Sequence, residues 1–145
     1  MDIQGAYQNI SQDDGVNILK KALEERDDKQ IPIEFISKLM ELVLKYNIFE
    51  FHGALYQQLI GTAMGSKPAP SYANIYLSKT IDPEVEKLGF KYGENKTTAF
   101  SLFKRFLDDI FIIYKGTTTK LHELLKEINE IHPTLKFTVC YNSKF

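Results

Sequence analysis

Apolar residues recur at helical spacing in several stretches of the chain. Ile36, Met40 and Val43 lie three or four positions apart, which predicts a helix over residues 33–47 with one apolar face. The same spacing, together with helix-entry residues, predicts a helix entered at Ser11, a helix over residues 69–81, a short helix from Asp82 to Gly89, and a helix that is capped by Thr118 or Thr119 and ends before Pro133.

Elsewhere the apolar period changes from 3.6 to 2, which is typical of strands. The segments with this period are residues 49–56 with a turn at His52-Gly53, residues 100–107 and 110–114 joined by Asp108-Asp109, and a last strand over residues 135–141. Residues 91–99 are predicted to form a polar loop. This order of elements predicts an α+β fold in which helices pack on one face of an antiparallel sheet.

Length and composition narrow the class of protein. The chain has 145 residues, of which 43% are hydrophobic and 26% charged, and this length suits one domain. The single Cys140 excludes an intramolecular disulfide, and no apolar run approaches the roughly 18–20 residues of a membrane span. The formal net charge is −1, so a polyanionic partner would have to be held locally. We therefore expect a soluble intracellular domain, or a piece of one, without a membrane partner.

The acidic pair Asp108-Asp109 lies between two strongly apolar strands. Aspartate is common in hairpin turns because its side chain hydrogen-bonds its own backbone, so the pair can be read as a structural turn. It can also be read as a ligand for divalent cations, which prefer hard oxygen donors and relieve the repulsion between neighbouring carboxylates. The sequence pattern alone leaves both interpretations open.

Two other segments complete a possible site around the acidic pair. Asp2 is followed five positions later by the aromatic Tyr7, a spacing that would place a ring near whatever a metal holds. The alternative is that Asp2 is only an exposed residue near the N-terminus. The segment Gly61–Asn74 is a loop rich in glycine and proline that opens a helix, which suits close approach of a flat ligand but also suits a plain connector.

Taken together, these segments resemble the reverse transcriptases of Penelope-like retroelements, in the order of that family's motifs. The matching segments are Asp2 to Ile10 with motif A, Phe49 to Gly53 and Tyr56 to Gln58 with the hairpin before motif B, Gly61 to Gly65 and Ala69 to Asn74 with motif B, Arg105 to Phe111 with motif C, and His132 to Thr138 with motif D and its sequel. The most specific match is the motif B segment.

The resemblance implies a right-hand polymerase palm that performs nucleotidyl transfer with two Mg²⁺ or Mn²⁺ ions. Asp2 and Asp108 would bridge the ions, Asp109 would assist, and the carbonyl of Ile3 could add a ligand. In this interpretation the three aspartates are the catalytic residues, and the ions clamp the attacking and leaving oxygens.

The resemblance also implies a set of nucleotide-binding residues. The backbone N–H groups of Gly5 and Ala6 could hold the triphosphate, and Tyr7 matches a ring that excludes the ribose 2′-hydroxyl. Met64 and Gly65 would face the nucleotide and the template base. Lys136 could donate a proton to pyrophosphate, although it can equally be a solvated strand residue.

The extent of the resemblance shapes the expected partners. Residues 1–145 would be one partial palm domain, with the fingers, thumb and endonuclease segments absent and Asp2 on a frayed terminus. The implied partners are an RNA template, a DNA primer, a deoxynucleoside triphosphate and the missing segments of the full-length protein. The location would be nuclear for an active element, and we expect the isolated chain to be inactive.

Two other functions remain open on the sequence. The chain could be a catalytically inactive remnant that acts as a binding module. It could also be a palm-type nucleotide cyclase, which uses similar paired acids without a template, but the segment Gly61–Asn74 disfavours that interpretation.

Overall fold

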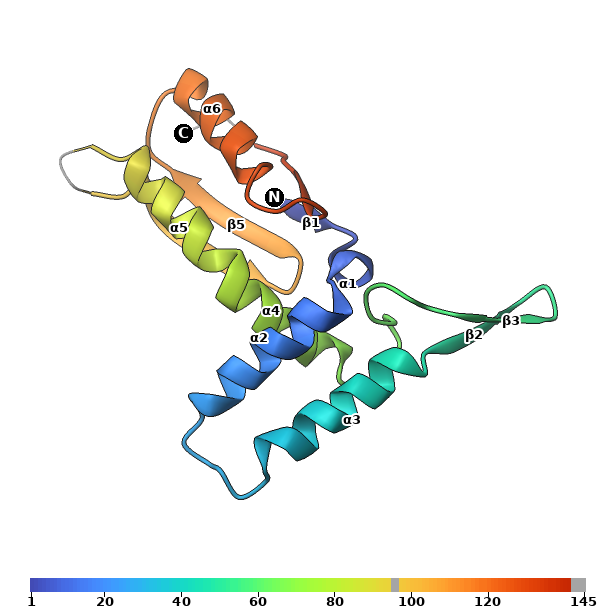
Figure 1. Ribbon diagram of the computed structural model, residues 1–145. Coiled ribbons are helices and arrows are strands. Elements are labelled where there is room, and N and C mark those ends of the chain that lie inside the picture. The colour runs from blue at the N-terminus through green and yellow to red at the C-terminus, as the bar shows by residue number, and fades with distance from the viewer. Residues whose placement is uncertain (95–96, 142–145) are drawn as a thin grey trace. The chain divides into compact units, whose positions relative to one another are not determined.

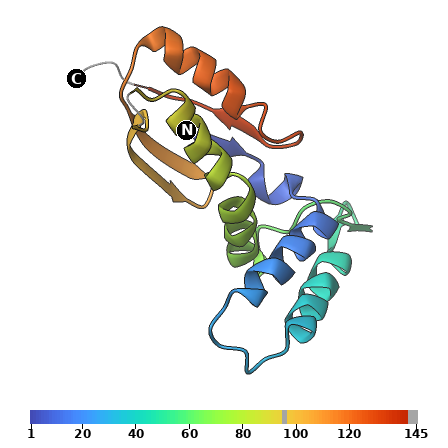
Figure 2. The ribbon, with the colours of Figure 1, turned by 60° about the vertical axis from the view of Figure 1, so that its left-hand side comes forward.

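The computed structural model describes residues 1–94 and 97–141, and the chain divides into two compact units (Figures 1 and 2). Unit 1 comprises residues 1–6 and 80–145, and unit 2 comprises residues 7–79. The chain is a mixture of helices and antiparallel sheets, which agrees with the predicted α+β class. Of the helices in the described part of the chain, none has the length and apolar character needed to cross a membrane.

Unit 1 is built on a four-stranded antiparallel sheet with the order β4-β5-β1-β6. Its strands are β1 (Asp2–Gln4), β4 (Phe100–Phe106), β5 (Asp109–Tyr114) and β6 (Lys136–Thr138). Because each strand is antiparallel to its neighbours, β1 runs parallel to β4 and β5 runs parallel to β6, each pair with one strand between them. With α5 (Asp82–Lys91) before β4 and α6 (Thr118–Ile128) before β6, this is a split β-α-β arrangement.

Strand β1 lies inside the sheet, so the expectation that Asp2 sits on a frayed terminus is wrong. The strand pairs with β5 on one side and with β6 on the other. The amino group of Met1 donates to the carbonyl of Ile110 at 2.8 Å, and the Ile110 amide donates back to Met1 at 2.8 Å. Ile3 is buried in the core. Pairing on both edges and one buried side chain therefore hold this short strand in place.

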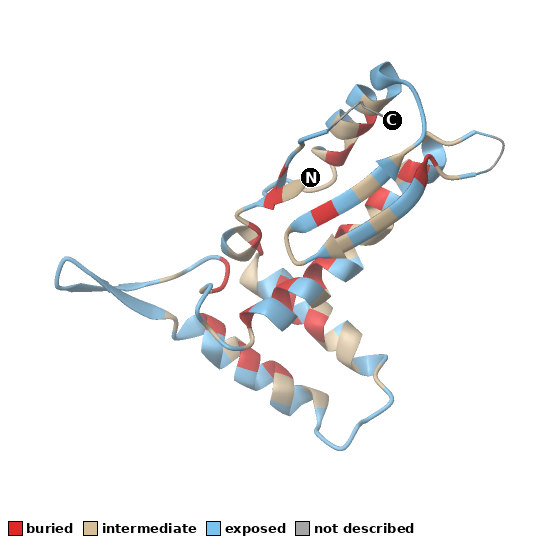
Figure 3. Cartoon of the chain, turned by 180° about the vertical axis from the view of Figure 1, so that it is seen from behind, coloured by how far each residue is buried: buried red, intermediate tan, exposed pale blue. Residues whose placement is uncertain are grey.

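Helices α5 and α6 of unit 1 lie against one face of the sheet and leave the other uncovered (Figures 1 and 3). The buried side chains of this unit alternate along the strands and recur along the helices, and they include Ile3, Val85, Ile110, Leu124, Ile128 and Phe137. One apolar layer between helices and sheet thus forms the core of unit 1, as the predicted arrangement requires.

Four predicted boundaries in unit 1 differ from the structure by a few residues. Helix α5 continues past Gly89 to Lys91, because Gly89 does not end the helix but makes room for the ring of Phe100, 2.6 Å from where a Cβ would lie. Helix α6 is capped by Thr117, whose hydroxyl accepts from the amide of Lys120. Strand β6 is limited to three residues because β1, its partner, offers only three. The predicted loop at 91–99 is in part the end of α5, and residues 95–96 lie outside the described residues.

Unit 2 contains the first three predicted helices and the first predicted hairpin. Its elements are α1 (Ala6–Asn9, whose first residue belongs to unit 1), α2 (Gln12–Glu24), α3 (Ile33–Lys45), β2 (Ile48–Phe51), β3 (Ala54–Gln57) and α4 (Ala69–Thr80, whose last residue belongs to unit 1). Ser11 caps α2 by accepting a hydrogen bond from the amide of Asp14, as predicted. The hairpin turns at His52-Gly53, where both residues have positive φ, which matches the twist of two-residue hairpins.

The buried face of α3 differs from the predicted one. Ser37, Met40 and Leu44 are buried, whereas Val43 is exposed and Ile36 is half-buried. The helix packs against α2 through a face that includes a small polar residue, so apolar spacing found the helix but not its orientation.

Candidate functional site

The central feature of the candidate site is a pair of aspartates that face each other across two strands. Asp2 in β1 is the direct partner of Asp109 in β5. Met1 and Ile110 exchange two hydrogen bonds on one side of the pair, and the Ile3 amide donates to the Asp108 carbonyl at 2.9 Å on the other. Asp2 and Asp109 are therefore a non-hydrogen-bonded pair, the kind whose side chains approach most closely.

Both aspartates belong to the uncovered face of the sheet in unit 1. Their chain neighbours Ile3 and Ile110 are buried beneath the helices, and successive side chains of a strand point to opposite faces. Asp109 is exposed and Asp2 is half-buried. The fold thus holds two carboxylates side by side at a solvent-accessible surface, where like charges directly opposite destabilise the sheet unless a cation is present.

Asp108 occupies the tight turn between β4 and β5. The turn residues are Leu107 and Asp108, whereas Asp109 is already the first residue of β5, so the predicted turn at Asp108-Asp109 is shifted by one position. Leu107 has φ 53°, which is unusual for a residue other than glycine. This shift explains why Asp109, and not Asp108, is the residue in register with Asp2.

A partly buried ion pair supports this turn from the helix side. Arg105 of β4 donates to the carboxylate of Asp82 through Nε at 2.7 Å and Nη2 at 2.8 Å. Its Nη1 donates to the carbonyl of Leu107 at 2.9 Å. In the sequence, Arg105 was noted only as part of the segment that resembles motif C. Its place on the inward-facing side of an alternating strand could have indicated a paired arginine.

Gly5 and Ala6 follow β1 directly. Gly5 has φ 59° and turns the chain from the strand into α1, and the side chain of Ala6 is buried. The structure thus places the two proposed triphosphate-binding amides within four positions of Asp2, at the end of its strand.

In unit 2, the loop that carries Met64 and Gly65 is fastened to the segment of Tyr7. The Thr62 amide donates to the Tyr7 carbonyl at 2.7 Å, and the Gly61 amide donates to the carbonyl of Ile10 at 3.1 Å. A Cβ on Gly61 would lie 2.5 Å from that same Tyr7 oxygen, so glycine is required by the close approach. The two motifs that the sequence separates are therefore joined by backbone hydrogen bonds.

The exposed end of this loop is accessible to a ligand. Met64 is 64% exposed, and there is open space around the position that a Cβ on Gly65 would take. Tyr7 is half-buried. These three proposed nucleotide contacts belong to unit 2, whereas the aspartates belong to unit 1.

Lys136 lies on β6 opposite Gln4 of β1, on the uncovered face. It is exposed, and its Nζ lies 3.4 Å from the backbone oxygen of Asn129, at the end of α6. This hydrogen bond is long and exposed, so the lysine keeps its ammonium group in solvent. Its location matches the interpretation as a solvated strand residue and leaves its proposed role a prediction.

The two carboxylates fit a magnesium ion that takes only part of its coordination from protein. Among residues 1–94 and 97–141, no three histidine, cysteine, aspartate or glutamate side chains are grouped so that they could hold a metal ion. Mg²⁺ commonly uses one or two carboxylates and fills its octahedral shell with water and substrate phosphates. Asp2 and Asp109 offer that donor set, and the structure brings these two of the three predicted carboxylate ligands into register.

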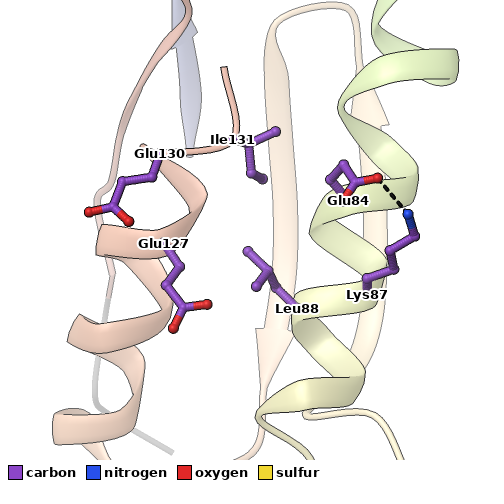
Figure 4. A pocket seen from close by; sticks show the side chains of 6 residues that line it. All are labelled: Glu84, Lys87, Leu88, Glu127, Glu130 and Ile131. Atoms are coloured by element: carbon purple, nitrogen blue, oxygen red, sulfur yellow. Dashed lines mark hydrogen bonds and ion pairs between the residues drawn. The ribbon is translucent and has the colours of Figure 1, made fainter. Parts of the chain in front are cut away.

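A shallow groove with a volume of about 310 Å³ lies between α5 and α6 of unit 1 (Figure 4). Its lining residues are Glu84, Lys87, Leu88, Glu127, Glu130 and Ile131. Hydrogen bonds from Lys91 and Tyr92 hold the pKa of Glu127 below its ordinary value, and the bond to Glu127 raises the pKa of Tyr92 to about 12. None of the residues predicted to form the site lines this groove, which lies on the helix side of the sheet.

No family model, curated protein or solved structure matches the chain.

Proposed function

We propose that this chain contributes the palm of an RNA-directed DNA polymerase similar to the reverse transcriptases of Penelope-like retroelements. The observation that carries the proposal is the cross-strand pair of Asp2 and Asp109. These residues come from the two segments that resemble motifs A and C, which lie far apart in the sequence. An ordinary hairpin turn gains nothing from a second acid on the neighbouring strand, whereas a cation site gains a second oxygen ligand.

The reaction follows from what these residues can hold. When bound, two Mg²⁺ or Mn²⁺ ions would stabilise the attacking 3′-hydroxyl and the leaving pyrophosphate of a nucleotidyl transfer. Asp2 and Asp109 would hold a cation on the uncovered face, and Asp108 and the carbonyl of Ile3 are further candidate ligands. The amides of Gly5 and Ala6 would bind the triphosphate as hydrogen-bond donors.

The residues of unit 2 would select the nucleotide and the template. Tyr7, held through its carbonyl by Thr62, would pack against the deoxyribose and exclude a ribose 2′-hydroxyl by its bulk. Met64 and Gly65 would give apolar contact to the base without reading its identity. Lys136 would serve as a proton donor to pyrophosphate. The partners are then an RNA template, a DNA primer and a deoxynucleoside triphosphate.

Binding of Mn²⁺ by the chain, followed by electron paramagnetic resonance, tests the proposal. We expect one site that binds more tightly when dTTP is added, because the triphosphate supplies further oxygen ligands. The site should be lost in Asp2→Asn and in Asp109→Asn and kept in Glu86→Gln, which removes an exposed acid of α5. Equal binding by all four proteins would refute the assignment of the pair.

The second candidate function is a binding module without catalysis. It is favoured by the hairpin of β2 and β3, where Phe49, Phe51 and Leu55 are each at least half exposed. Such a remnant would fold and show no Mn²⁺ site on the sheet, so the same experiment separates the two functions.

A further inference from the structure

The partly buried ion pair between Arg105 and Asp82 is unusual for the position it occupies in unit 1. The Arg105 side chain is only 5% exposed and that of Asp82 22%. Two parallel hydrogen bonds join them, a geometry that fixes the plane of the guanidinium group. An apolar side chain of similar volume would fill an inward-facing strand position at least as well, so packing alone does not account for this pair.

The third side-chain nitrogen of Arg105 connects the ion pair to the hairpin turn. Nη1 donates to the carbonyl of Leu107, so the guanidinium bridges the first turn of α5 and the acidic hairpin turn. Leu107 has φ 53°, a conformation that a side-chain-bearing residue keeps only when its surroundings hold it. Within unit 1, Arg105 is thus a hydrogen-bond donor that holds this turn in its strained conformation.

We infer that Arg105, oriented by Asp82, is a positioning residue that keeps Asp109 opposite Asp2. A hairpin whose turn relaxes can slip in register, and a slip of one residue moves a side chain to the other face of the sheet. The carboxylate of Asp109 would then leave the uncovered face. The effect of such a slip on metal binding rests on the proposed function, whereas the role of Arg105 in holding the turn does not.

The structural part can be measured without metal. The amide of Ile3 donates to the carbonyl of Asp108, so its hydrogen exchange reports whether the turn stays docked on β1. Exchange is measured by NMR relative to the slowest amides of α6, which removes the effect of global stability. In Arg105→Lys we expect the Ile3 amide to exchange at least about tenfold faster on this relative scale, because lysine is a point charge that cannot reproduce the fork of three donors.

Two further variants make the comparison specific. Asp82→Asn loses the charge of the pair but keeps Arg105 and its bond to Leu107, so the relative exchange of Ile3 should rise less than in Arg105→Lys. Glu127→Gln breaks the exposed pair with Lys91 and should leave Ile3 unchanged. An unchanged exchange rate of the Ile3 amide in Arg105→Lys, or an equal increase of that rate in all three variants, would overturn the positioning role. Asp82→Asn also provides the measurement if Arg105→Lys does not fold.

Mn²⁺ affinity then tests the link to the site. Removing a residue that orients a metal ligand commonly costs about 10–100-fold in affinity. We expect a loss of about tenfold in Arg105→Lys and none in Glu127→Gln, with Mn²⁺ alone as the probe. If the unaltered chain binds no Mn²⁺ while the Ile3 amide responds as described, the proposed function fails and the turn-positioning role stands. If Mn²⁺ binds equally to the unaltered chain and to Arg105→Lys, the positioning inference is wrong and the proposed function survives.

Discussion

Replacing Asp109 by asparagine should stabilise the metal-free protein. Asp2 and Asp109 are direct partners in a non-hydrogen-bonded pair, so two negative charges face each other on the sheet. Asparagine keeps the size and the polarity of the side chain and removes one charge. The substitution therefore isolates the repulsion between the carboxylates, since neither the strand pairing nor the core is altered.

The size of the effect follows from the geometry of the pair. Side chains in such a pair have Cβ atoms about 4.5–5.5 Å apart, and two charges at about 5 Å in water repel by about 0.8 kcal/mol. Asp109 is exposed and Asp2 only half-buried, so the value near the water limit applies. We expect a gain of about 0.5–1 kcal/mol in the free energy of unfolding, which corresponds to a Tm increase of about 2–4 °C. The gain should shrink at about 1 M salt, where the screening length is about 3 Å.

Thermal unfolding with EDTA and then with Mn²⁺ measures the effect and its reversal. At a Mn²⁺ concentration of ten times its Kd, binding adds about 1.4 kcal/mol to the unaltered protein and little to Asp109→Asn. The order of the two melting temperatures should therefore invert when the metal is added. The control Glu86→Gln removes one charge from α5 and should follow the unaltered protein in both conditions. Two melting curves that shift in parallel with Mn²⁺ would refute the reasoning, as would a lower Tm of Asp109→Asn in EDTA.

Three further predictions concern positions outside the acidic pair. Gly61→Ala should lower the free energy of unfolding by more than about 1 kcal/mol in urea titration, because φ is 73° and the new Cβ would lie 2.5 Å from the carbonyl oxygen of Tyr7. Gly89→Ala should also destabilise the protein, because the new Cβ would lie 2.6 Å from the ring of Phe100. This loss is expected even though alanine is more favourable than glycine in a helix by about 1 kcal/mol. The pKa of Glu127 is lowered on folding, so its contribution to stability is present at neutral pH and is lost as the pH falls through the carboxyl's range. In urea titrations at a series of pH values, Glu127→Gln should be less stable than the unaltered protein at neutral pH and equal to it in acid.

Matched variants make these outcomes decisive. Gly53 has φ 76°, close to the 73° of Gly61, but open space surrounds the position of its Cβ, so the difference between Gly53→Ala and Gly61→Ala measures the clash. Equal losses would mean that backbone strain alone is at work. A stability gain in Gly89→Ala would show that α5 shifts to accommodate the methyl group. A constant difference between Glu127→Gln and the unaltered protein from neutral to acid pH would contradict the assigned ion pair.

The sequence predicted the elements that depend on local spacing and local capping. Ser11 caps α2 because its hydroxyl accepts from an amide three positions later, and this signal is contained within four residues. The hairpin at His52-Gly53 depends on a two-residue turn that glycine favours, so it was equally predictable. Features of this kind need no knowledge of the rest of the chain.

Features set by distant partners were missed or misplaced. The ion pair of Arg105 and Asp82 joins a strand to the start of a helix 23 positions earlier, and no periodicity relates the two residues. Strand β1 was expected to fray because no earlier segment of the sequence could pin it, whereas the strands that hold it, β5 and β6, come much later in the chain. The face of α3 that is buried depends on where α2 lies, which apolar spacing on α3 alone does not report.

The two hairpins of the chain show why the acidic one is not an ordinary turn. In the hairpin of β2 and β3 positive φ falls on His52, a residue type that adopts this conformation more often than most, and on Gly53, which adopts it without strain. In the hairpin of β4 and β5 the positive φ falls on Leu107, a residue for which that conformation is costly. A turn that served only to reverse the chain would be more stable with glycine or asparagine at this position. Instead it has a strained leucine, a buried arginine bonded to that leucine's carbonyl, and an acid placed opposite another acid. The strained leucine and the facing acids are each unfavourable for folding, and both adjoin the turn that Arg105 holds, where departures from the rules of stable folds are expected when the site has a chemical role.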